Sequence, residues 1–312
     1  MTQVEDTSRD MRLDPESFAQ GYFKNAVYRH WDPYEIEGLE EDKEKFLEYE
    51  PTESEMEESR MAVARFGAGE EAVTEDLMPL AMVLSDINDQ MFISSQIYEE
   101  AKHTQFFDRY WREVFNPVAE ELGLEVTQPT DQRYFNDDYI AVFDKTEDAM
   151  NRLLEEDTPE NRVRAYCHYH LGVESVLAQT GYYGITSAFS DKGSDEIALG
   201  DWPDSNGLVN GIAKIRSDEG RHVGFGMQKV RGYVQSGEVD ESVVQDVLMD
   251  LMPHIAGTVS DFEENVNPVP LVEYARDKLM RRIDIITEED AEIPGVEELV
   301  KLDDGESSAT AD

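Results

Sequence analysis

The sequence contains very little cysteine and few basic residues. Its 312 residues include a single cysteine, Cys167, so the chain cannot form an intramolecular disulfide. Cys167 lies in an apolar helical stretch, where we expect a packed residue rather than a reactive thiol. Only 27 lysines and arginines accompany 70 aspartates and glutamates, which gives a formal charge of -43. A field of that sign repels phosphate backbones and anionic lipid surfaces, so nucleic-acid binding is not expected.

Long apolar runs are also missing. No run approaches the roughly 20 residues that span a bilayer, and the N-terminus has neither a basic nor an apolar signal region. We therefore expect a soluble cytoplasmic protein without membrane insertion. The dense acidic charge is typical of halophilic proteins, because salt in a concentrated cytoplasm screens the repulsion between like charges.

The pattern of apolar residues predicts three segments. Residues 1–58 form an N-terminal arm with one short helix, residues 59–286 form an all-α domain, and residues 287–312 form an acidic flexible tail. Within the domain, the helix that follows the turn at 86–89 is expected to stop before Asn116 and Pro117. The remaining expected elements are a short helix over 15–31, helices that begin at Ser59 and after Thr158, a polar surface loop over 190–207, and helices over 242–266 and 269–285.

Two stretches place a glutamate and a histidine three residues apart on a face that is otherwise apolar. The pairs are Glu100 with His103 and Glu219 with His222. This spacing keeps both side chains on the core side of a helix. Burial of a carboxylate and an imidazole is costly unless a partner compensates them, and a divalent metal ion compensates both. Two pairs therefore indicate two metal ions.

Two further helices each direct one glutamate, Glu70 or Glu174, toward the same core. Taken singly, such a glutamate is more often a salt-bridge partner, and one Glu-x-x-His pair arises by chance. Together the six groups match the ligand set of dinuclear carboxylate proteins, in which four helices direct such groups into a bundle. The sequence therefore predicts an all-α fold with a ferritin-like four-helix bundle core and additional peripheral helices. His168 and His170 have no carboxylate at ligand spacing and are interpreted as packing or surface residues.

Three sequence blocks, Gly69–Leu77, Glu99–Gln105 and Ser217–His222, resemble the ribonucleotide reductase small-subunit superfamily. Within it, the chain is most similar to the ligand-binding oxidases, over about residues 20–285. This resemblance implies a dioxygen-activating oxidase with a mixed manganese and iron centre, although a di-iron centre remains an alternative. It also implies a bound long-chain fatty acid, a valine–tyrosine ether cross-link and a homodimer.

The resemblance also implies a role for each site residue. Val73 and Tyr169 match the cross-linked pair, and Asp218 matches a carboxylate that orients a histidine ligand. Tyr169 lies five residues before Glu174, which a π-bulge near Gly172 would bring onto one face. The implied ligands of the manganese position are Glu70, Glu100 and His103, and those of the iron position are Glu174, Glu219 and His222.

Two other functions are kept open. One is the radical-generating small subunit of a ribonucleotide reductase. Such a subunit commonly has a tyrosine where this chain has Phe107, and it needs a redox-active tyrosine in its C-terminal tail, but no tyrosine or tryptophan follows Tyr274. The other function is ferritin-like iron storage. The metal assignment depends on the resemblance, because iron(II) outcompetes manganese(II) at a generic site of oxygen and nitrogen ligands.

Overall fold

The structure is a computed structural model that describes residues 12–190, 194, 196–200, 202–262, 266–288 and 290–302. Within these ranges the chain is all-α, as predicted, and β pairing is limited to an isolated bridge between Ala198 and Val266. The elements are α1 (Phe18–Tyr28), α2 (Leu39–Tyr49), α3 (Glu53–Val83), α4 (Ile87–Tyr110), the π-helix η1 (Trp111–Phe115), α5 (Asn116–Leu122), the 3-10 helix η2 (Gln132–Tyr134), α6 (Asp137–Glu155), α7 (Pro159–Tyr166), the π-helix η3 (Cys167–Ala178), α8 (Gln179–Ala188), α9 (Asn206–Gln235), α10 (Ser242–Val259), α11 (Pro268–Thr287) and α12 (Val296–Leu299).

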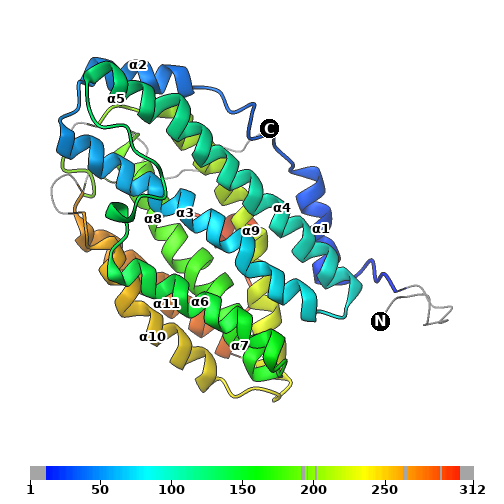
Figure 1. Cartoon of the computed structure of the whole chain (residues 1–312). Coiled ribbons are helices and arrows are strands. Elements are labelled where there is room, and N and C mark those ends of the chain that lie inside the picture. Colours follow the sequence, from blue (N-terminus) through cyan, green and yellow to red (C-terminus); the bar gives the residue numbers. More distant parts are fainter. Residues whose placement is uncertain are drawn as a thin grey trace.

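Four long helical rods form the core bundle. They are α3, α4, α9 and the continuous rod made by α7, η3 and α8. Helix α3 packs along α4, and α9 contacts α4, η3 and α8 (Figure 1). Each rod buries an apolar stripe against the others, which produces the bundle predicted from the helical period.

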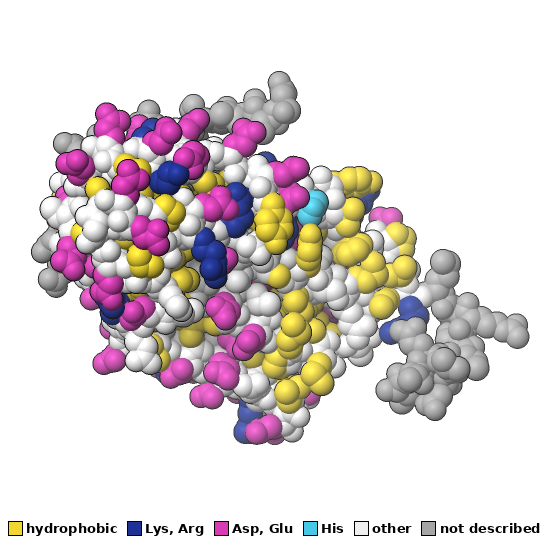
Figure 2. Space-filling model, turned by 45° about the horizontal axis from the view of Figure 1, so that its top comes forward, with side chains coloured by type: hydrophobic (Ala, Val, Ile, Leu, Met, Phe, Trp, Pro, Cys, Tyr) yellow, Lys and Arg dark blue, Asp and Glu magenta, His cyan; other side chains and the backbone are white. Residues whose placement is uncertain are grey.

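Peripheral helices cover two sides of this bundle. Helices α1 and α2 pack on the side formed by α4 and α9, whereas α6, α10 and α11 pack around η3 and α8 (Figure 1). Acidic side chains are spread over much of the surface in Figure 2, as the composition requires. In the part of the chain that is described, no helix is long and apolar enough to cross a membrane.

Helix α4, which follows the turn predicted at 86–89, belongs to a longer helical segment than predicted. It begins at Ile87, where the Asp86 side chain accepts from the backbone N–H groups of Asn88 and Asp89. It does not stop before Asn116, because η1 and α5 continue it to Leu122. In η1 the N–H of Asn116 bonds the carbonyl of Trp111, five residues back, and this wider turn accommodates a residue without an N–H, Pro117.

The acidic part of the N-terminal arm contains a helix that the sequence did not predict. Helix α2 lies in the acidic stretch of the arm and buries Leu39, Asp42 and Phe46. Asp42 accepts from the backbone N–H groups of Gly207 and Leu208, at 3.0 and 2.9 Å, and so caps the first turn of α9. The buried carboxylate of Asp42 therefore connects the arm to the bundle through hydrogen bonds.

The C-terminal segment also differs from the prediction of a flexible tail. Helix α12 packs on α9, and Leu299 is fully buried. Arg282 donates to the carbonyl of Leu299 at 2.8 Å, and Arg216 donates to the carbonyl of Val300 at 2.8 Å. The prediction is thus wrong for residues 296–302, because the buried Arg282 and the half-buried Arg216 donate to the last carbonyls of this segment. The rest of the predicted tail, 303–312, lies outside the described residues.

Three other predicted boundaries are changed. Helix α3 begins at Glu53, not at Ser59, because Thr52 and Glu55 form a capping box at its N-terminus. Helix α10 ends at Val259, not at 266. In the loop predicted over 190–207, Ile197 is fully buried and Ala198 forms the bridge to Val266, so part of this segment packs on the body. Residues 191–193, 195 and 201 of that loop lie outside the described residues.

Candidate metal centre

The six predicted ligand side chains meet in the interior of the bundle. Each of the six residues is at most 6% exposed. They come from all four core rods: Glu70 from α3, Glu100 and His103 from α4, Glu174 from η3, and Glu219 and His222 from α9. The helical phase that the sequence predicted is therefore correct at each rod. Glu71, the neighbour of Glu70, is exposed as expected.

One group of four side chains surrounds His103. Its Nδ1 lies 3.3 Å from Glu70 Oε2, 3.0 Å from Glu100 Oε2 and 3.5 Å from Glu219 Oε1. One ligand atom from each of these four residues lies within 4.8 Å of the others, which is close enough for a single ion to contact all four.

A second group surrounds His222. Its Nδ1 lies 3.1 Å from Glu100 Oε1, 3.4 Å from Glu174 Oε1 and 3.5 Å from Glu219 Oε2. Glu100 and Glu219 therefore each direct one carboxylate oxygen toward either histidine. The resemblance implies a single metal position for each of these glutamates, and in the structure each lies within 3.5 Å of both histidines.

The electrostatics of this cluster fit two bound cations. Burial raises the pKa of Glu70 to about 8, and repulsion from Glu100 and Glu219 adds to this effect. Burial, and then the charge of Glu219, also raises the pKa of Glu174 well above its usual value. Two carboxylate oxygens and one imidazole nitrogen in the cluster make no hydrogen bond within the described residues: Glu174 Oε2, Glu219 Oε2 and His222 Nδ1. Four carboxylates with two imidazoles form a donor set suited to a pair of divalent ions.

The distal nitrogen of His103 faces a second carboxylate. Nε2 of His103 lies 3.2 Å from Asp218 Oδ2, which also accepts from Trp31 Nε1 at 2.7 Å and from Lys102 Nζ at 3.0 Å. Burial opposes ionisation of Asp218, but the His103 hydrogen bond and the charges of Arg221 and Lys102 lower its pKa. The Trp31 ring is stacked on His103, with ring centroids 6.1 Å apart. His103 is thus held in one orientation from two sides.

The distal nitrogen of His222 has an equivalent partner. Nε2 of His222 lies 2.8 Å from Glu99 Oε2. The fully buried Arg221 donates from Nη2 to both Glu99 and Asp218. One guanidinium therefore joins the two carboxylates that face the two histidines.

The sequence did not identify Trp31, Glu99 or Arg221 as site residues. Glu99 lies in the block Glu99–Gln105 and Arg221 in the block Ser217–His222, each next to a predicted ligand. This adjacency is the feature of the sequence that could have indicated them. Trp31 lies in the arm, 72 positions before His103, and its contact with Asp218 depends on how α1 packs. No local pattern indicates such a contact.

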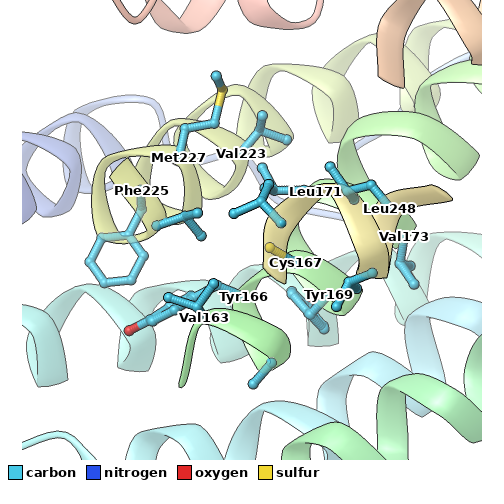
Figure 3. Close-up of a cluster of buried hydrophobic side chains, with 14 of the residues drawn as sticks. Val163, Tyr166, Cys167, Tyr169, Leu171, Val173, Val223, Phe225, Met227 and Leu248 are labelled. Carbon is cyan, nitrogen blue, oxygen red and sulfur yellow. The ribbon is translucent and has the colours of Figure 1, made fainter. Parts of the chain in front are cut away.

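Tyr169 and Val73 border the centre from different rods. Tyr169 donates from its hydroxyl to Glu100 Oε1 at 3.0 Å, and burial raises its pKa well above the usual value, so the phenol stays protonated. It belongs to η3, a π-helix that includes Gly172 and confirms the predicted bulge. Tyr169 lies in the apolar cluster of Figure 3, which joins η3 to α9 and α10. Val73 is 4% exposed and belongs to the same cluster.

A largely apolar cavity adjoins the centre. Val73 and the carboxylates of the cluster line one part of it. Apolar side chains from α3, α6, η3, α8, α11 and the end of α10 with the loop after it line the rest. The apolar lining includes Phe66, Phe143, Leu177, Ile185, Phe262 and Leu271. The two other histidines of this region do not line it. His168 is partly exposed and His170 is fully buried, and Cys167 is a buried free cysteine.

Comparison with known proteins supports this description. No family model matches the chain. A point variant of an R2-like ligand-binding oxidase with aerobically reconstituted Mn/Fe cofactor aligns with a TM-score of 0.74 and 26% identity, over 91% of this chain and 97% of that chain. Another variant, with aerobically reconstituted Fe/Fe cofactor, aligns with a TM-score of 0.74 and 25% identity, over 89% of this chain and 98% of that chain. These neighbours confirm the resemblance read from the sequence and the fold class, and they indicate a dinuclear-metal oxidoreductase.

Proposed function

Since the chain has the fold of the R2-like ligand-binding oxidases, we propose that it is a dinuclear-metal oxidase that reacts with dioxygen. The observation that supports this most strongly is the position of Glu100 and Glu219, each of which faces both histidines. Two carboxylates between two imidazoles suit two ions that share ligands. Neither the reductase subunit nor ferritin-like storage is favoured by the neighbours.

The proposed ligands are the six residues predicted from the sequence. Glu70 and His103 would hold the first ion, and Glu174 and His222 would hold the second. Glu100 and Glu219 would contact both ions, since each has an oxygen within 3.5 Å of either histidine. Manganese with iron is the proposed pair, and di-iron is the alternative, since the neighbours were reconstituted with either. When bound, such a pair supplies the electrons for reaction with dioxygen. The protein supplies orientation, charge and a site from which water is excluded.

We propose that the cavity binds an elongated apolar molecule such as a long-chain fatty acid. Its walls are mostly aliphatic and aromatic, and the carboxylates of the centre lie along one part of it. An apolar chain in this cavity would exclude water from the side of the centre that Val73 borders. Organic extraction of the purified protein, followed by mass spectrometry, identifies such a ligand directly.

We also propose an ether cross-link between Val73 and Tyr169. The Cβ–H bond of Val73 and the O–H bond of Tyr169 would break, a C–O bond would form, and dioxygen would accept the two electrons and two protons. The hydrogen bond from Tyr169 to Glu100 supports this, because it directs the phenol oxygen toward the centre. Val73 lines the cavity beside the same carboxylates.

Reconstitution followed by mass spectrometry tests the oxidase and the cross-link. Metal-free protein is loaded with manganese(II) and iron(II) without oxygen, and one half is then exposed to air. The expected product is a linked pair of peptides containing Val73 and Tyr169 that has lost two hydrogen atoms, in the aerobic half alone. Tyr169→Phe should bind both metals but form no link. A fully loaded and aerated protein without the link would contradict the cross-link, whereas failure to bind two ions would contradict the dinuclear site.

A homodimer completes the proposal. Large uncharged side chains are exposed on α1 and α4, including Tyr28 at 77% and Tyr98 at 54%. Apolar side chains gather on one face in Figure 2, although the chain as a whole is strongly acidic. Such a patch is typical of an interaction surface. Light scattering at high salt measures the molar mass of the protein in solution. A monomer at micromolar concentration would contradict the proposed homodimer.

A further inference from the structure

Two buried polar side chains beside the centre have no role in the function proposed above. Gln96 of α4 and His170 of η3 are both fully buried. Nε2 of Gln96 donates to Glu174 Oε1 at 2.8 Å, and Oε1 of Gln96 lies 3.2 Å from His170 Nε2. The three residues therefore form a hydrogen-bonded chain from η3 to α4 and back to η3.

The chemistry of the partners fixes the direction of each bond. In the ionised form that binds a metal ion, the Glu174 carboxylate only accepts, so the amide of Gln96 presents its NH2 group to Glu174. Its carbonyl oxygen then faces His170, whose Nε2 must hold the proton. Nδ1 of His170 is left bare, and it makes no hydrogen bond within the described ranges of the chain. Burial lowers the pKa of His170 to about 3, so the ring is neutral and one tautomer is defined.

The ring of His170 is also fixed by its surroundings. Its centroid lies 4.7 Å from that of Tyr169, 5.4 Å from Tyr166 and 6.1 Å from Phe225. A Cβ at position 226 would lie only 2.3 Å from the His170 Cβ, so Gly226 leaves the room that the histidine needs. His170 is thus a rigid donor for the Gln96 amide.

We propose that Gln96 and His170 are positioning residues that hold the Glu174 carboxylate beside His222 for the second metal ion. Glu174 Oε1, the oxygen that accepts from Gln96, is also the oxygen 3.4 Å from His222 Nδ1. Glu174 lies in the π-helix η3, where the hydrogen-bonding register differs from that of an α-helix, so a fixed contact from α4 sets where the carboxylate points. This inference rests on the proposed dinuclear site. It adds Gln96 and His170, which are not among the six predicted metal ligands.

The test uses cobalt(II) as a spectroscopic probe. Metal-free wild-type protein, Gln96→Leu, His170→Phe and Tyr166→Phe are titrated with cobalt(II) without oxygen, and bound metal is counted by element analysis. Gln96→Leu removes the donor at similar volume, whereas His170→Phe leaves the Gln96 amide without its fixed partner. Tyr166→Phe is the matched control, because it removes a buried polar atom that packs on His170 and, among the described residues, has no hydrogen-bond partner.

The expected result is selective for one ion. Gln96→Leu should weaken binding of the second cobalt ion about 10- to 100-fold and shift the visible absorption of that ion, with the first ion unchanged. His170→Phe should shift the same absorption band, and Tyr166→Phe should match the wild type. Two cobalt ions bound to Gln96→Leu with wild-type affinity and spectrum would overturn the inference. If Gln96→Leu does not fold, as judged by circular dichroism, His170→Phe provides the test. An unshifted absorption band in that variant would overturn the inference. A wild type that binds fewer than two ions instead contradicts the dinuclear site itself.

Discussion

Glu99 and His222 are joined by a hydrogen bond of 2.8 Å between Oε2 and Nε2, on the side of the imidazole that faces away from the cluster. A carboxylate in this place fixes the ring orientation and makes Nδ1 a stronger ligand. Asp218 has the same relation to His103, but it is shared with Lys102. Glu99 and Asp218 are linked in turn by Arg221.

We predict that Glu99→Gln weakens metal binding beside His222. The amide keeps the size of the glutamate but removes the negative charge, so the imidazole becomes a weaker donor. The affinity for the second ion should fall about 10- to 100-fold. Competition with a chromophoric chelator measures this loss, and an unchanged affinity would show that Glu99 only balances the charge of Arg221.

We predict opposite outcomes for two neighbouring glutamates of α3. Glu70→Gln removes a carboxylate that lies 3.3 Å from His103 Nδ1, so the first ion should be lost or bound at least about 10-fold more weakly. Glu71→Gln changes an exposed residue one position later and should leave metal content at the wild-type value. Element analysis after gel filtration decides between them. Equal metal content in the two variants would contradict the assignment of Glu70.

The helical phase was enough to identify the six groups of the centre, but not the residues that hold them. Glu70 and Glu71 are neighbours that differ in the face of α3 on which they lie. The spacing of the apolar residues correctly predicted that Glu70 is buried and Glu71 exposed. Even the π-helix could be expected, because the resemblance assigns Tyr169 to the same site as Glu174, and residues five positions apart do not share one face of an α-helix. The contact between Trp31 and Asp218 could not be expected, since it joins an arm to a core helix by packing alone.

There is also a physical reason why the sequence did not predict α2 and α12. Helix α2 is strongly acidic and buries few apolar residues, so its composition resembles a solvated segment. Its position is set by Asp42, which caps another helix far along the chain. Helix α12 has four residues and depends on Arg282 and Arg216 from distant helices. Such long-range polar contacts leave no periodic signal in the sequence.

We predict that Asp42→Ala destabilises the protein by about 2 kcal/mol. The substitution leaves the N–H groups of Gly207 and Leu208 at the start of α9 without their acceptor, and it also removes the partner of the Tyr110 hydroxyl. Urea unfolding at constant salt measures the change. Glu41→Ala, at an exposed position of the same helix, should alter the free energy of unfolding by less than about 0.5 kcal/mol. Equal effects of the two substitutions would contradict the cap.

We predict a pH-dependent effect of Asp76→Asn. Burial, followed by repulsion from Glu147 and Glu75, raises the pKa of Asp76 to about 7. The folded state therefore binds this proton more tightly than the unfolded state, whose aspartate has a pKa near 3.8. Wild-type stability should fall as pH rises between these values.

The asparagine variant lacks this titration. It should match the wild type near pH 4 and exceed it at pH 8, by about 1 kcal/mol after allowance for solvent screening. Chemical unfolding at both pH values and at one salt concentration provides the comparison. A variant that is less stable than the wild type at pH 8 would contradict the raised pKa.

Two glycines of α9 should respond in opposite ways to alanine. A Cβ at position 220 would lie 2.3 Å from the carbonyl oxygen of Val296, whereas a Cβ at position 232 would have no atom within 4 Å among the described residues. Gly220→Ala should therefore displace α12 and cost about 1–3 kcal/mol. Gly232→Ala should stabilise the helix by about 0.5–1 kcal/mol, because alanine has the higher helix propensity.

Limited proteolysis distinguishes displacement of α12 from general destabilisation. Position 220 lies between two predicted ligands, Glu219 and His222, but the clash is with Val296 of α12 and not with a ligand. Cleavage near 296–302 should therefore become faster in Gly220→Ala at temperatures where the rest of the chain stays resistant, and Gly232→Ala should cleave like the wild type. If Gly220→Ala lowers stability without exposing 296–302, close packing of α12 is not the reason for glycine at this position.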